Sequence, residues 1–510
     1  MKARGADLLA RSLAAAGVKH VFTLSGNHVM PVFDAALDAK LPLVHVRHEA
    51  AAVHMADAWG RLTGEPGVAL VTGGPGHANA VSALYTALEA DSPMVLLSGH
   101  APLDELGHGA FQEMRQADIA APLCKASWTA RSAATLGEDV ARAFGIARSG
   151  RPGPVHVSFP SDVLEAQADD APARVTLPRN CIQGKDAEII VKSLAGARAP
   201  VILCGPAMMN AGGPERMRRL EEACGAPVIG MESPRGVKDP SLGRLAAVLA
   251  KTDVVFLLGK KKDFTVGFGR AFPKAEVLEL SAGLDIQPSC DVIIDAASRL
   301  GAGHRAWRDE VHSEIAYRSP EWKAVRSSPE GPLHPVELCR EVQDLLSGDA
   351  IFVSDGGEFG QWAQAWLSAR RRIINGPAGS IGAALPFAAA AKLASPGSTV
   401  VATLGDGTFG FHMAEIETAA RCKLGYVAVV GNDACWNAEH QIQIRTYGAA
   451  RAHGLDLLPV RYGAVAAAMG AHAEDVQRPG ELRAALQRAK ATGTVACVNV
   501  AIERLAAPAY

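Results

Sequence analysis

Short apolar runs alternate along the chain with longer segments that carry apolar residues at helical spacing. The runs contain many β-branched residues and most end at glycine or proline, a pattern typical of buried β-strands. Examples of these runs are residues 20–24, 68–73, 93–99, 155–160, 200–205, 253–259, 350–357, 399–405 and 426–432. Strands that alternate with helices in this way predict an α/β fold in which helices cover both faces of parallel sheets.

Two segments interrupt this alternation. Residues 165–187 are polar and contain proline without a clear period, and residues 305–334 combine charged residues with several turn formers. Both are predicted to be linkers with a short helix or two. They leave three doubly wound parallel-sheet domains, at 1–165, 188–304 and 335–510, as expected for 510 residues at about 150 residues per domain.

The amino-acid composition and net charge indicate which kinds of partner the protein binds. The formal net charge is −2 with both signs spread evenly, which argues against a nucleic-acid partner and favours a small-molecule substrate. The nine cysteines form no CxxC pair, as expected in a reducing compartment. The first 17 residues resemble a helix more than a signal peptide, and no apolar run approaches the ~20 residues of a membrane span. We therefore expect a soluble, cytoplasmic protein with no membrane partner.

A carboxylate between two glycines follows one of the predicted strands. The stretch VVATLGDGTFG (400–410) carries Asp406, and the next strand, 426–432, is followed by Asp433. Because parallel strands end at the same edge of a sheet, both carboxylates are expected at the edge where α/β folds bind ligands. Glycine lets backbone N–H groups approach a phosphate, and two carboxylates can hold a divalent cation that neutralises it.

Two other interpretations stay open at this level. An aspartate between glycines is most often a turn or helix-cap residue. The stretch GGPGHANA (73–80) could be the phosphate loop of a nicotinamide oxidoreductase. That fold needs an acidic residue near the end of the following strand, whereas Asp91 precedes the strand.

Several motifs together resemble those of thiamine diphosphate (ThDP) enzymes. The GDG of 405–407, followed by a helix and a strand ending in Asn-Asp, is similar to the GDG…NN fingerprint of that family. Residues 45–81, 109–113 and 379–394 resemble acetolactate synthases and benzaldehyde lyases, and residues 257–269 are more similar to 2-hydroxyacyl-CoA lyases. The resemblance covers nearly the whole chain. It implies a pyrimidine-binding domain first, a central domain next and a diphosphate-binding domain last.

The resemblance implies a Mg²⁺ ion and a diphosphate at the strand edge. The implied metal ligands are Asp406, Asp433 and the backbone carbonyl of Cys435. The residues implied to contact the diphosphate are Gly405, Gly407 and Thr408. The family usually has asparagine where this chain has Asp433, and the extra negative charge could tighten the metal or weaken the cofactor. We expect binding to persist, because aspartate is itself a hard-oxygen ligand.

Three further residues are implied to act on the cofactor. Glu49 would hydrogen-bond N1′ of the aminopyrimidine and favour the imino form, which removes the C2 proton; taken alone, it is a helix-start carboxylate. Ile381 would hold the cofactor bent, and the backbone carbonyl of Gly379 would accept the amino proton.

The resemblance also assigns residues to the substrate. His28 is expected to transfer protons and Gln112 to contact the substrate, with a loop position as the alternative for each. The other residues assigned to the substrate pocket are His77, Phe111, Trp436 and His440. His77 could instead cap a helix, and a tryptophan one turn into a helix is more often part of a core.

We expect a ThDP- and Mg²⁺-dependent lyase or transferase that cleaves or forms a carbon-carbon bond next to a carbonyl. The first interpretation is a non-oxidative 2-oxo acid decarboxylase and carboligase, or a 2-hydroxy ketone lyase, similar to acetolactate synthase. The alternatives are a 2-hydroxyacyl-CoA lyase or an oxalyl-CoA decarboxylase-like enzyme and, more remotely, the nicotinamide oxidoreductase. A catalytically silent relative is disfavoured by the presence of Glu49.

The resemblance has consequences for partners as well. The expected substrates are 2-oxo acids, aldehydes or 2-hydroxyacyl compounds. In the family the first and last domains meet across a subunit interface, so a homodimer is the expected minimum unit and a homotetramer is common. Lys260, Lys261 and Lys262 could hold the phosphate of FAD or ADP, but a solvated basic turn explains them equally well, and the short central domain lacks the loop expected of a firm FAD binder.

Overall fold

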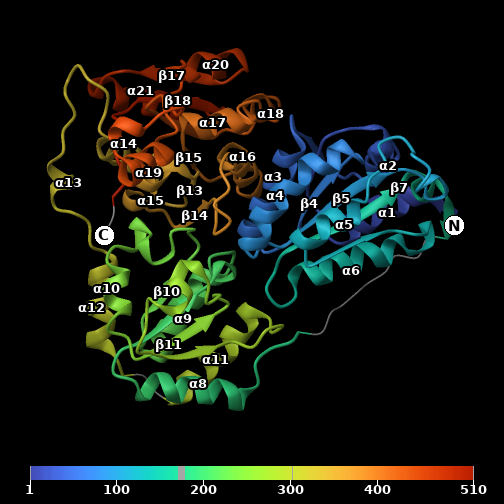
Figure 1. Cartoon of the computed structure of the whole chain (residues 1–510). Helices are drawn as coiled ribbons and strands as arrows, with labels where there is room; N and C mark the ends of the chain where they lie inside the picture. Colours follow the sequence, from blue (N-terminus) through green and yellow to red (C-terminus); the bar gives the residue numbers. More distant parts are fainter. Residues whose placement is uncertain (1, 170–178, 301–302, 509–510) are drawn as a thin grey trace. The chain divides into compact units, whose positions relative to one another are not determined.

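The chain is an α/β protein built on three parallel sheets (Figure 1). The computed structural model describes residues 2–169, 179–300 and 303–508. Contacts within the chain divide it into two compact units. Unit 1 comprises the residues up to Glu232, Thr252–Lys261 and Lys274–Arg305, and unit 2 comprises Ser233–Lys251, Lys262–Pro273 and the residues from Ala306 onward.

Unit 1 contains a six-stranded parallel sheet and a four-stranded one. In order across the first sheet, the strands are β3 (Leu43–His45), β2 (Val21–Thr23), β4 (Gly67–Val71), β5 (Met94–His100), β7 (Pro154–Pro160) and β6 (Ala126–Thr129). Its helices are α1 (Gly5–Ala15), α2 (Met30–Asp38), α3 (Glu49–Thr63), α4 (Pro75–Glu89), α5 (Gln116–Ala120), α6 (Leu136–Arg148) and α7 (Ser161–Glu165). Every residue of β4, β5 and β7 is buried. Because successive side chains of a strand point to opposite faces, both faces of this sheet are covered.

The four-stranded sheet of unit 1 is also parallel. Its order is β10 (Val228–Gly230), β9 (Pro200–Cys204), β11 (Val254–Leu258) and β12 (Glu276–Glu279). The helices that pack in its core are α8 (Gly184–Gly196), α9 (Gly213–Cys224) and α11 (Ile286–Leu300). A separate antiparallel pair joins β1 (Lys2–Arg4) to β8 (Gln167–Asp169).

Unit 2 contains the second six-stranded parallel sheet. Its order is β14 (Arg371–Ile374), β13 (Ile351–Ser354), β15 (Val400–Gly405), β16 (Val427–Asn432), β18 (Ala496–Ala501) and β17 (His472–Val476). The helices that follow these strands are α15 (Gly357–Trp366), α16 (Ala384–Ala394), α17 (Asp406–His412), α18 (Glu415–Arg421), α19 (Asn437–Tyr447), α20 (Tyr462–Ala468) and α21 (Pro479–Ala491), with α10 (Leu245–Leu249) and α14 (Pro335–Gln343) in the same unit. The two central strands β15 and β16 are buried except at their last residue. That last residue of each is therefore placed at the carboxyl edge of the sheet, where the chain leaves the core.

These sheets confirm the predicted α/β fold class. Each of the nine predicted apolar runs contains a strand. Each of these nine strands has a neighbouring strand on both sides in a parallel sheet. The domain boundaries at 1–165, 188–304 and 335–510 stay a prediction. One of the three parallel sheets falls within each range, while the segments Ser233–Lys251 and Lys262–Pro273 pack with unit 2.

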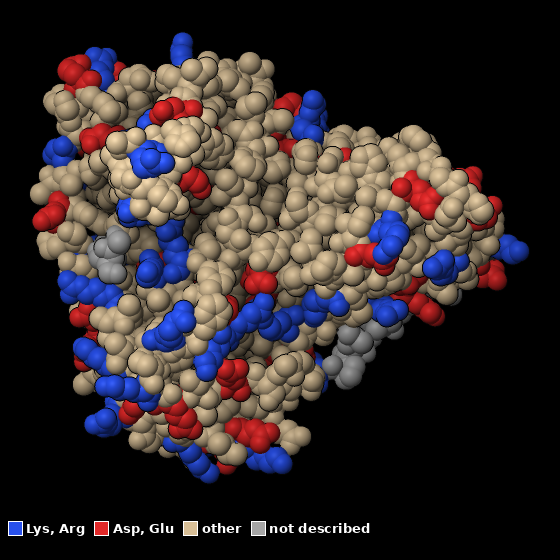
Figure 2. Space-filling model, in the orientation of Figure 1, with Lys and Arg blue, Asp and Glu red and all other residues tan. Residues whose placement is uncertain are grey.

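The described residues of the two predicted linkers include short helices and the strand β8. The segment 305–334 carries two short helices, α12 (Arg305–Ile315) and α13 (Glu321–Ala324), as predicted. Of the segment 165–187, residues 170–178 lie outside the described residues, and α8 begins at Gly184. Charged side chains of both signs are scattered over the visible face of the molecule (Figure 2), in keeping with the balanced composition.

Candidate active site

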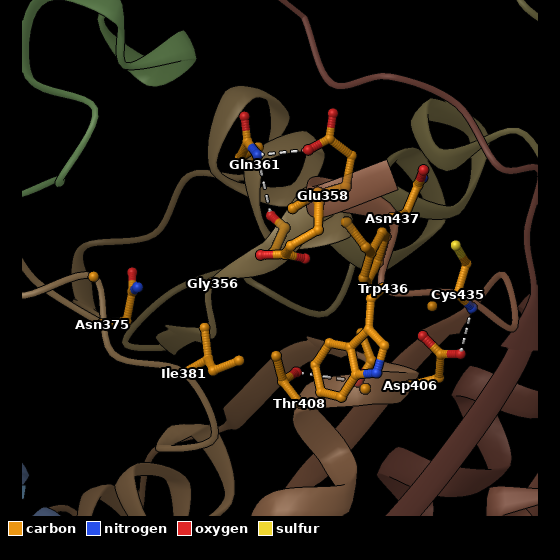
Figure 3. A pocket seen from close by; sticks show the side chains of 18 of the residues that line it. Gly356, Glu358, Gln361, Asn375, Ile381, Asp406, Thr408, Cys435, Trp436 and Asn437 are labelled. Atoms are coloured by element: carbon orange, nitrogen blue, oxygen red, sulfur yellow. Dashed lines mark hydrogen bonds between the residues drawn. The ribbon is translucent and has the colours of Figure 1, made fainter. Parts of the chain in front are cut away.

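The turn from β15 to α17 brings a buried carboxylate to the edge of the sheet. Gly405 ends the strand in an extended conformation, and Asp406 begins the helix with 2% of its surface exposed. A carboxylate at a helix N-terminus is favoured by the helix dipole, which explains Asp406 locally. Its Oδ2 atom also accepts a hydrogen bond of 3.2 Å from the backbone amide of Cys435, on the next strand's turn (Figure 3).

The neighbouring strand β16 supplies the second carboxylate. β15 and β16 are parallel with Gly405 opposite Gly431, so Asp433 leaves the sheet beside Asp406. Ala434 then adopts a left-handed conformation with φ of 52°, which is unfavourable for a residue with a Cβ atom. Asp406, Asp433 and Cys435 line one cavity, so the structure brings the three predicted metal ligands together.

Burial disfavours the ionised form of both carboxylates. Burial raises the pKa of Asp406 from 3.8 to about 6, although backbone amides of Gly407 and Cys435 favour the ionised form. Burial first, and then the Asp406 charge, raise the pKa of Asp433 to about 7. A cation between these oxygens would remove this cost, and carboxylate and carbonyl oxygens are the donors that Mg²⁺ prefers.

A metal at this edge would need more than side-chain ligands. Among the residues that the structure describes, no group of three or more His, Cys, Asp or Glu side chains could hold a metal ion. Two carboxylates and a backbone carbonyl leave coordination positions that ligand oxygens or water can fill, which is how Mg²⁺ is commonly bound beside phosphates. The donor set therefore fits a metal that is bound together with a phosphorylated ligand.

Two glycines of the turn have different surroundings. A Cβ atom at Gly407 would lie 2.7 Å from Cζ3 of Trp436, so the indole ring packs directly over the backbone (Figure 3). A Cβ atom at Gly405 would meet nothing within 4 Å, and Oγ1 of Thr408 donates to the Gly405 carbonyl at 3.1 Å. The space next to Gly405 is therefore free to receive a ligand, whereas Gly407 is needed for close packing within the protein.

A second loop of unit 2 reaches the same cavity. Ile381 lines this cavity. Gly379, two residues before Ile381, has a left-handed backbone conformation with φ of 69°. Asp355, at the end of β13, accepts hydrogen bonds from the backbone amides of Gly382 (2.9 Å) and Ala384 (3.0 Å) and so holds this loop. Burial raises the pKa of Asp355 to about 6, against the effect of these bonds.

The cavity of about 230 Å³ is polar on one side (Figure 3). Glu358, from α15, accepts a hydrogen bond of 2.8 Å from Gln361 and one of 2.6 Å from the backbone amide of Ala507. Among the residues that line this cavity, Arg235 is the one cationic side chain, whereas four carboxylates line it: Glu358, Asp406, Asp433 and Glu439. Arg235 is thus the side chain of this cavity that can pair with a negatively charged ligand.

Trp436 and His440, both assigned to the substrate, occupy different positions. Trp436 lines the cavity, with its ring over Gly407 and in edge-on contact with Phe411. His440 lies one turn further along α19, and its amide bonds the Trp436 carbonyl at 3.0 Å, but it is not among the lining residues of this cavity. The geometry favours Trp436 over His440, and both assignments stay predictions.

Glu49 occupies the first turn of α3 in unit 1. The carboxyl is 8% exposed and accepts a hydrogen bond of 3.1 Å from Nδ2 of Asn79. Gly76 lies close by, since a Cβ atom there would be 3.4 Å from Oε1 of Glu49. A buried carboxyl with one side-chain partner is suited to exchange a proton with a ligand, and it also satisfies the plain helix-start interpretation.

His28 and Phe111 line a second cavity, of about 590 Å³, in unit 1. The two rings stack with centroids 6.1 Å apart, and Nδ1 of His28 lies 3.3 Å from Oγ1 of Thr72. Burial lowers the pKa of His28, which favours its neutral form. Gln112, the residue after Phe111, has a left-handed backbone conformation with φ of 57°. Strained conformations of this kind are found at binding loops.

His77 is fully buried in unit 1 and is not among the residues that line either cavity. Its Nδ1 lies 2.9 Å from Oγ of Ser98, and its ring packs against His156 at 4.6 Å. Burial lowers the pKa of His77 to about 4. These contacts favour an interior, neutral histidine, while the assignment to the substrate stays a prediction.

The lysines proposed for a nucleotide phosphate have other partners. Lys260 is buried and donates to the carbonyl of Lys261 at 2.9 Å, and Nζ of Lys261 forms an ion pair with Glu89 at 3.1 Å. Both contacts lie within unit 1. The interpretation as FAD or ADP ligands is not supported by these contacts and stays untested.

Sequence reasoning missed Arg235, Glu358, Asp355 and Arg504. Asp355 and Glu358 follow β13 in the stretch SDGGE, which repeats the arrangement of glycines and a carboxylate after a strand and could have been recognised. Arg235 gave no such signal, because it comes from a segment about 120 residues before the rest of the cavity and joins it only through tertiary packing.

Two further observations concern the whole described chain. All nine cysteines are free thiols. Within residues 2–169, 179–300 and 303–508, none of the helices combines the length and the apolar character needed to cross a bilayer.

Comparison with known proteins gives a consistent result. The chain matches the family models for the thiamine pyrophosphate enzyme N-terminal TPP binding domain over residues 3–119 and C-terminal TPP binding domain over residues 355–500. It is 34% identical to the acetolactate synthase large subunit IlvG of Mycobacterium tuberculosis, over 97% of this chain and 94% of that protein. It is 30% identical to 2-hydroxyacyl-CoA lyase 2 of Caenorhabditis elegans (93% and 85%) and 29% identical to the acetolactate synthase isozyme 3 large subunit of Escherichia coli (95% and 92%).

Proposed function

Since this chain belongs to the thiamine pyrophosphate (ThDP) enzyme family and is a ThDP-dependent enzyme, we propose that it uses Mg²⁺ and ThDP to cleave or form a carbon-carbon bond next to the carbonyl of a 2-oxo acid. The observation that carries this proposal is the pair Asp406 and Asp433 at neighbouring strand tips of one cavity, with the open space at Gly405 beside them.

In this proposal the strand tips hold the metal and the diphosphate. Asp406, Asp433 and the carbonyl of Cys435 would bind Mg²⁺, whose positive charge would offset the cost of holding two buried carboxylates, a cost that raises the pKa of both. Gly405 and Thr408 would contact the diphosphate oxygens, while Gly407 would let Trp436 close over the turn. The N-terminus of α17 adds backbone amides that favour an anion.

The remaining residues would orient the cofactor and move its protons. ThDP, when bound, supplies a nucleophilic carbon and an electron sink for the bond that breaks. Glu49 would hold the proton shared with the aminopyrimidine, for which its burial and its single bond from Asn79 are suitable. Ile381 would hold the bent conformation and the Gly379 carbonyl would accept the amino proton, with Asp355 fixing that loop.

Arg235 supports a substrate that carries negative charge. It is the one cation among the residues that line this cavity, and a guanidinium pairs well with a carboxylate. This favours a 2-oxo acid over a neutral aldehyde as the first substrate. A 2-hydroxyacyl-CoA lyase is the second candidate, because relatives with that name align over most of the chain and a CoA thioester also carries negative charge.

The reaction is tested by supplying ThDP and Mg²⁺ with a panel of 2-oxo acids, aldehydes and 2-hydroxyacyl-CoAs. Release of CO₂ and a new ketol from a 2-oxo acid would support the first candidate, and cleavage of the acyl-CoA to an aldehyde would support the second. No turnover across the panel, with the cofactor bound, would contradict both. Arg235→Gln should raise KM for the active anion at least about tenfold, since a charge-assisted pair contributes more than about 1.4 kcal/mol. The exposed Arg451→Gln is the matched control.

We retain two expectations about the assembly and the compartment as part of the proposal. A homodimer would be the minimum active unit and a homotetramer its larger form, as the family resemblance implies. The cytoplasm is the proposed compartment, for which the nine free thiols give support.

A further inference from the structure

The turn that carries Asp433 is held from outside the sheet by one arginine. Arg504 lies three residues after the end of β18, and its Nη2 donates to the carbonyls of Asp433 at 3.2 Å and Ala434 at 3.1 Å. Its Nη1 donates to Oδ1 of Asp456 at 2.8 Å. One guanidinium thereby joins three segments that are distant in the sequence.

The segment around Asp456 supports the same turn through its backbone. Leu457 donates to the Ala434 carbonyl at 2.8 Å, and Trp436 donates to the Leu455 carbonyl at 2.8 Å. The Ala434 carbonyl therefore accepts bonds from both Leu457 and Arg504. These bonds explain how Ala434 persists with a φ of 52°, a conformation that costs an L-residue roughly 1–2 kcal/mol.

The positive charge of Arg504 also affects the electrostatics of the turn 433–435. Asp433 stands where ThDP enzymes usually carry a neutral asparagine, so the site holds one negative charge more than that pattern. The guanidinium bonds the backbone carbonyl of this same residue at 3.2 Å, so its positive charge lies next to the position that carries the additional carboxylate. Arg504 is 33% exposed and Asp456 is 76% exposed, so the exposed acid neutralises the guanidinium only weakly.

We propose that Arg504 is a positioning residue for the metal-binding turn 433–435, and that its positive charge compensates for aspartate at position 433. The inference rests on the proposed Mg²⁺ and ThDP site, because it concerns how that site is held. Arg504 lies outside the GDG and Asn-Asp motifs and is not among the residues that line the cavity described above.

The test is calorimetric titration of ThDP into the full chain at saturating Mg²⁺, which requires no turnover. Arg504→Gln should weaken ThDP binding about tenfold, because two bonds to the turn and one charge are lost. Arg504→Lys should keep binding within about threefold, since the charge remains. Arg451→Gln, which removes an exposed arginine of the same unit, should leave binding unchanged.

The decisive variant combines two changes. Asp433→Asn removes the charge that Arg504 compensates, so the double variant Asp433→Asn/Arg504→Gln should bind ThDP more tightly than Arg504→Gln, although the two bonds to the turn stay lost. A purely structural role of Arg504 would give the same loss in both backgrounds and would overturn the charge compensation. Wild-type affinity in Arg504→Gln would overturn the whole inference.

Two more outcomes are distinguishable. One outcome is that Arg504→Gln does not fold while Arg504→Lys and the double variant do. This outcome supports the proposal, because the turn then tolerates the loss of the arginine only when the charge is balanced. If none of the three folds, the charge compensation is refuted. If the wild-type chain itself does not bind ThDP, the proposed function fails, and this inference fails with it for a different and recognisable reason.

Discussion

The backbone amide of Cys435 donates a hydrogen bond of 3.2 Å to the carboxylate of Asp406. This bond joins the tips of two neighbouring parallel strands, β15 and β16, at the edge where the chain leaves the buried core. It fixes the distance between the turn that carries Asp433 and the first turn of α17. The site is therefore a property of two adjacent strand ends and not of one loop.

Substitutions of the glycines in the turn from β15 to α17 should affect protein stability and ThDP binding to different extents. Gly405→Ala adds a methyl group to open space, so the melting temperature of the apoprotein should stay the same while ThDP affinity falls at least tenfold. Gly407→Ala forces the Trp436 ring to move and should lower both. Gly410→Ala, in open space on α17, should lower neither. Differential scanning fluorimetry and calorimetric titration measure the two quantities, and unchanged ThDP affinity in Gly405→Ala would place the diphosphate elsewhere.

Substitution of the buried carboxyl of unit 1 should stop proton removal without releasing the cofactor. Glu49→Gln should slow the exchange of the ThDP C2 proton for deuterium by roughly 10²–10⁴, the usual range for a lost acid-base group. ThDP affinity should change by less than about fivefold, because the amide keeps the shape and one hydrogen bond. Exchange followed by NMR measures the rate, with the exposed Glu65→Gln as control. An unchanged exchange rate would show that Glu49 is only a helix-start residue.

Asp355 should make stability depend on pH in a definite direction. Its pKa is raised from 3.8 to about 6 in the folded chain, so the folded state holds the proton more tightly than the unfolded state. The resulting stabilisation is complete below pH 3.8 and is lost as pH rises through 6. Between pH 4 and pH 7, the free energy of unfolding of the wild type should fall relative to that of Asp355→Asn by up to about 3 kcal/mol.

Urea unfolding at several pH values tests this. The exposed Asp344→Asn should change stability by no more than about 0.5 kcal/mol at each pH. If the difference between wild type and Asp355→Asn is the same at pH 4 and pH 7, the buried carboxyl does not titrate as described.

The fold was predictable from sequence for most strands that are buried on both faces. Runs such as 399–405 and 426–432 became β15 and β16, in the centre of a sheet. In the parallel sheets, the strands outside the predicted runs are the central strand β18 and six strands at sheet edges: β3, β6, β10, β12, β14 and β17. Edge strands are short and partly exposed, as the pattern of β6 and β12 shows, so they lack the continuous apolar run that marks a central strand.

The candidate site was predictable where its residues stand at strand ends. Asp406 and Asp433 follow apolar strands directly, and parallel pairing alone brings them together. Arg235 and Arg504 were not predictable, because each reaches the site from a segment far away in the sequence whose path depends on packing. His77 shows the opposite case, since its motif suggested a pocket residue while its side chain lies inside the protein against Ser98.

Calorimetric titration of ThDP into the wild-type chain and Asp406→Asn, with Mg²⁺ and with EDTA, tests the central claim most directly. The proposed site predicts saturable binding to the wild type in Mg²⁺, none in EDTA, and at least about 100-fold weaker binding to Asp406→Asn, because an amide cannot replace a carboxylate that would bind the metal and that accepts the hydrogen bond from the Cys435 amide. Equal affinity in Asp406→Asn, or binding that is unaffected by EDTA, would contradict the account of a metal-held cofactor at these strand tips.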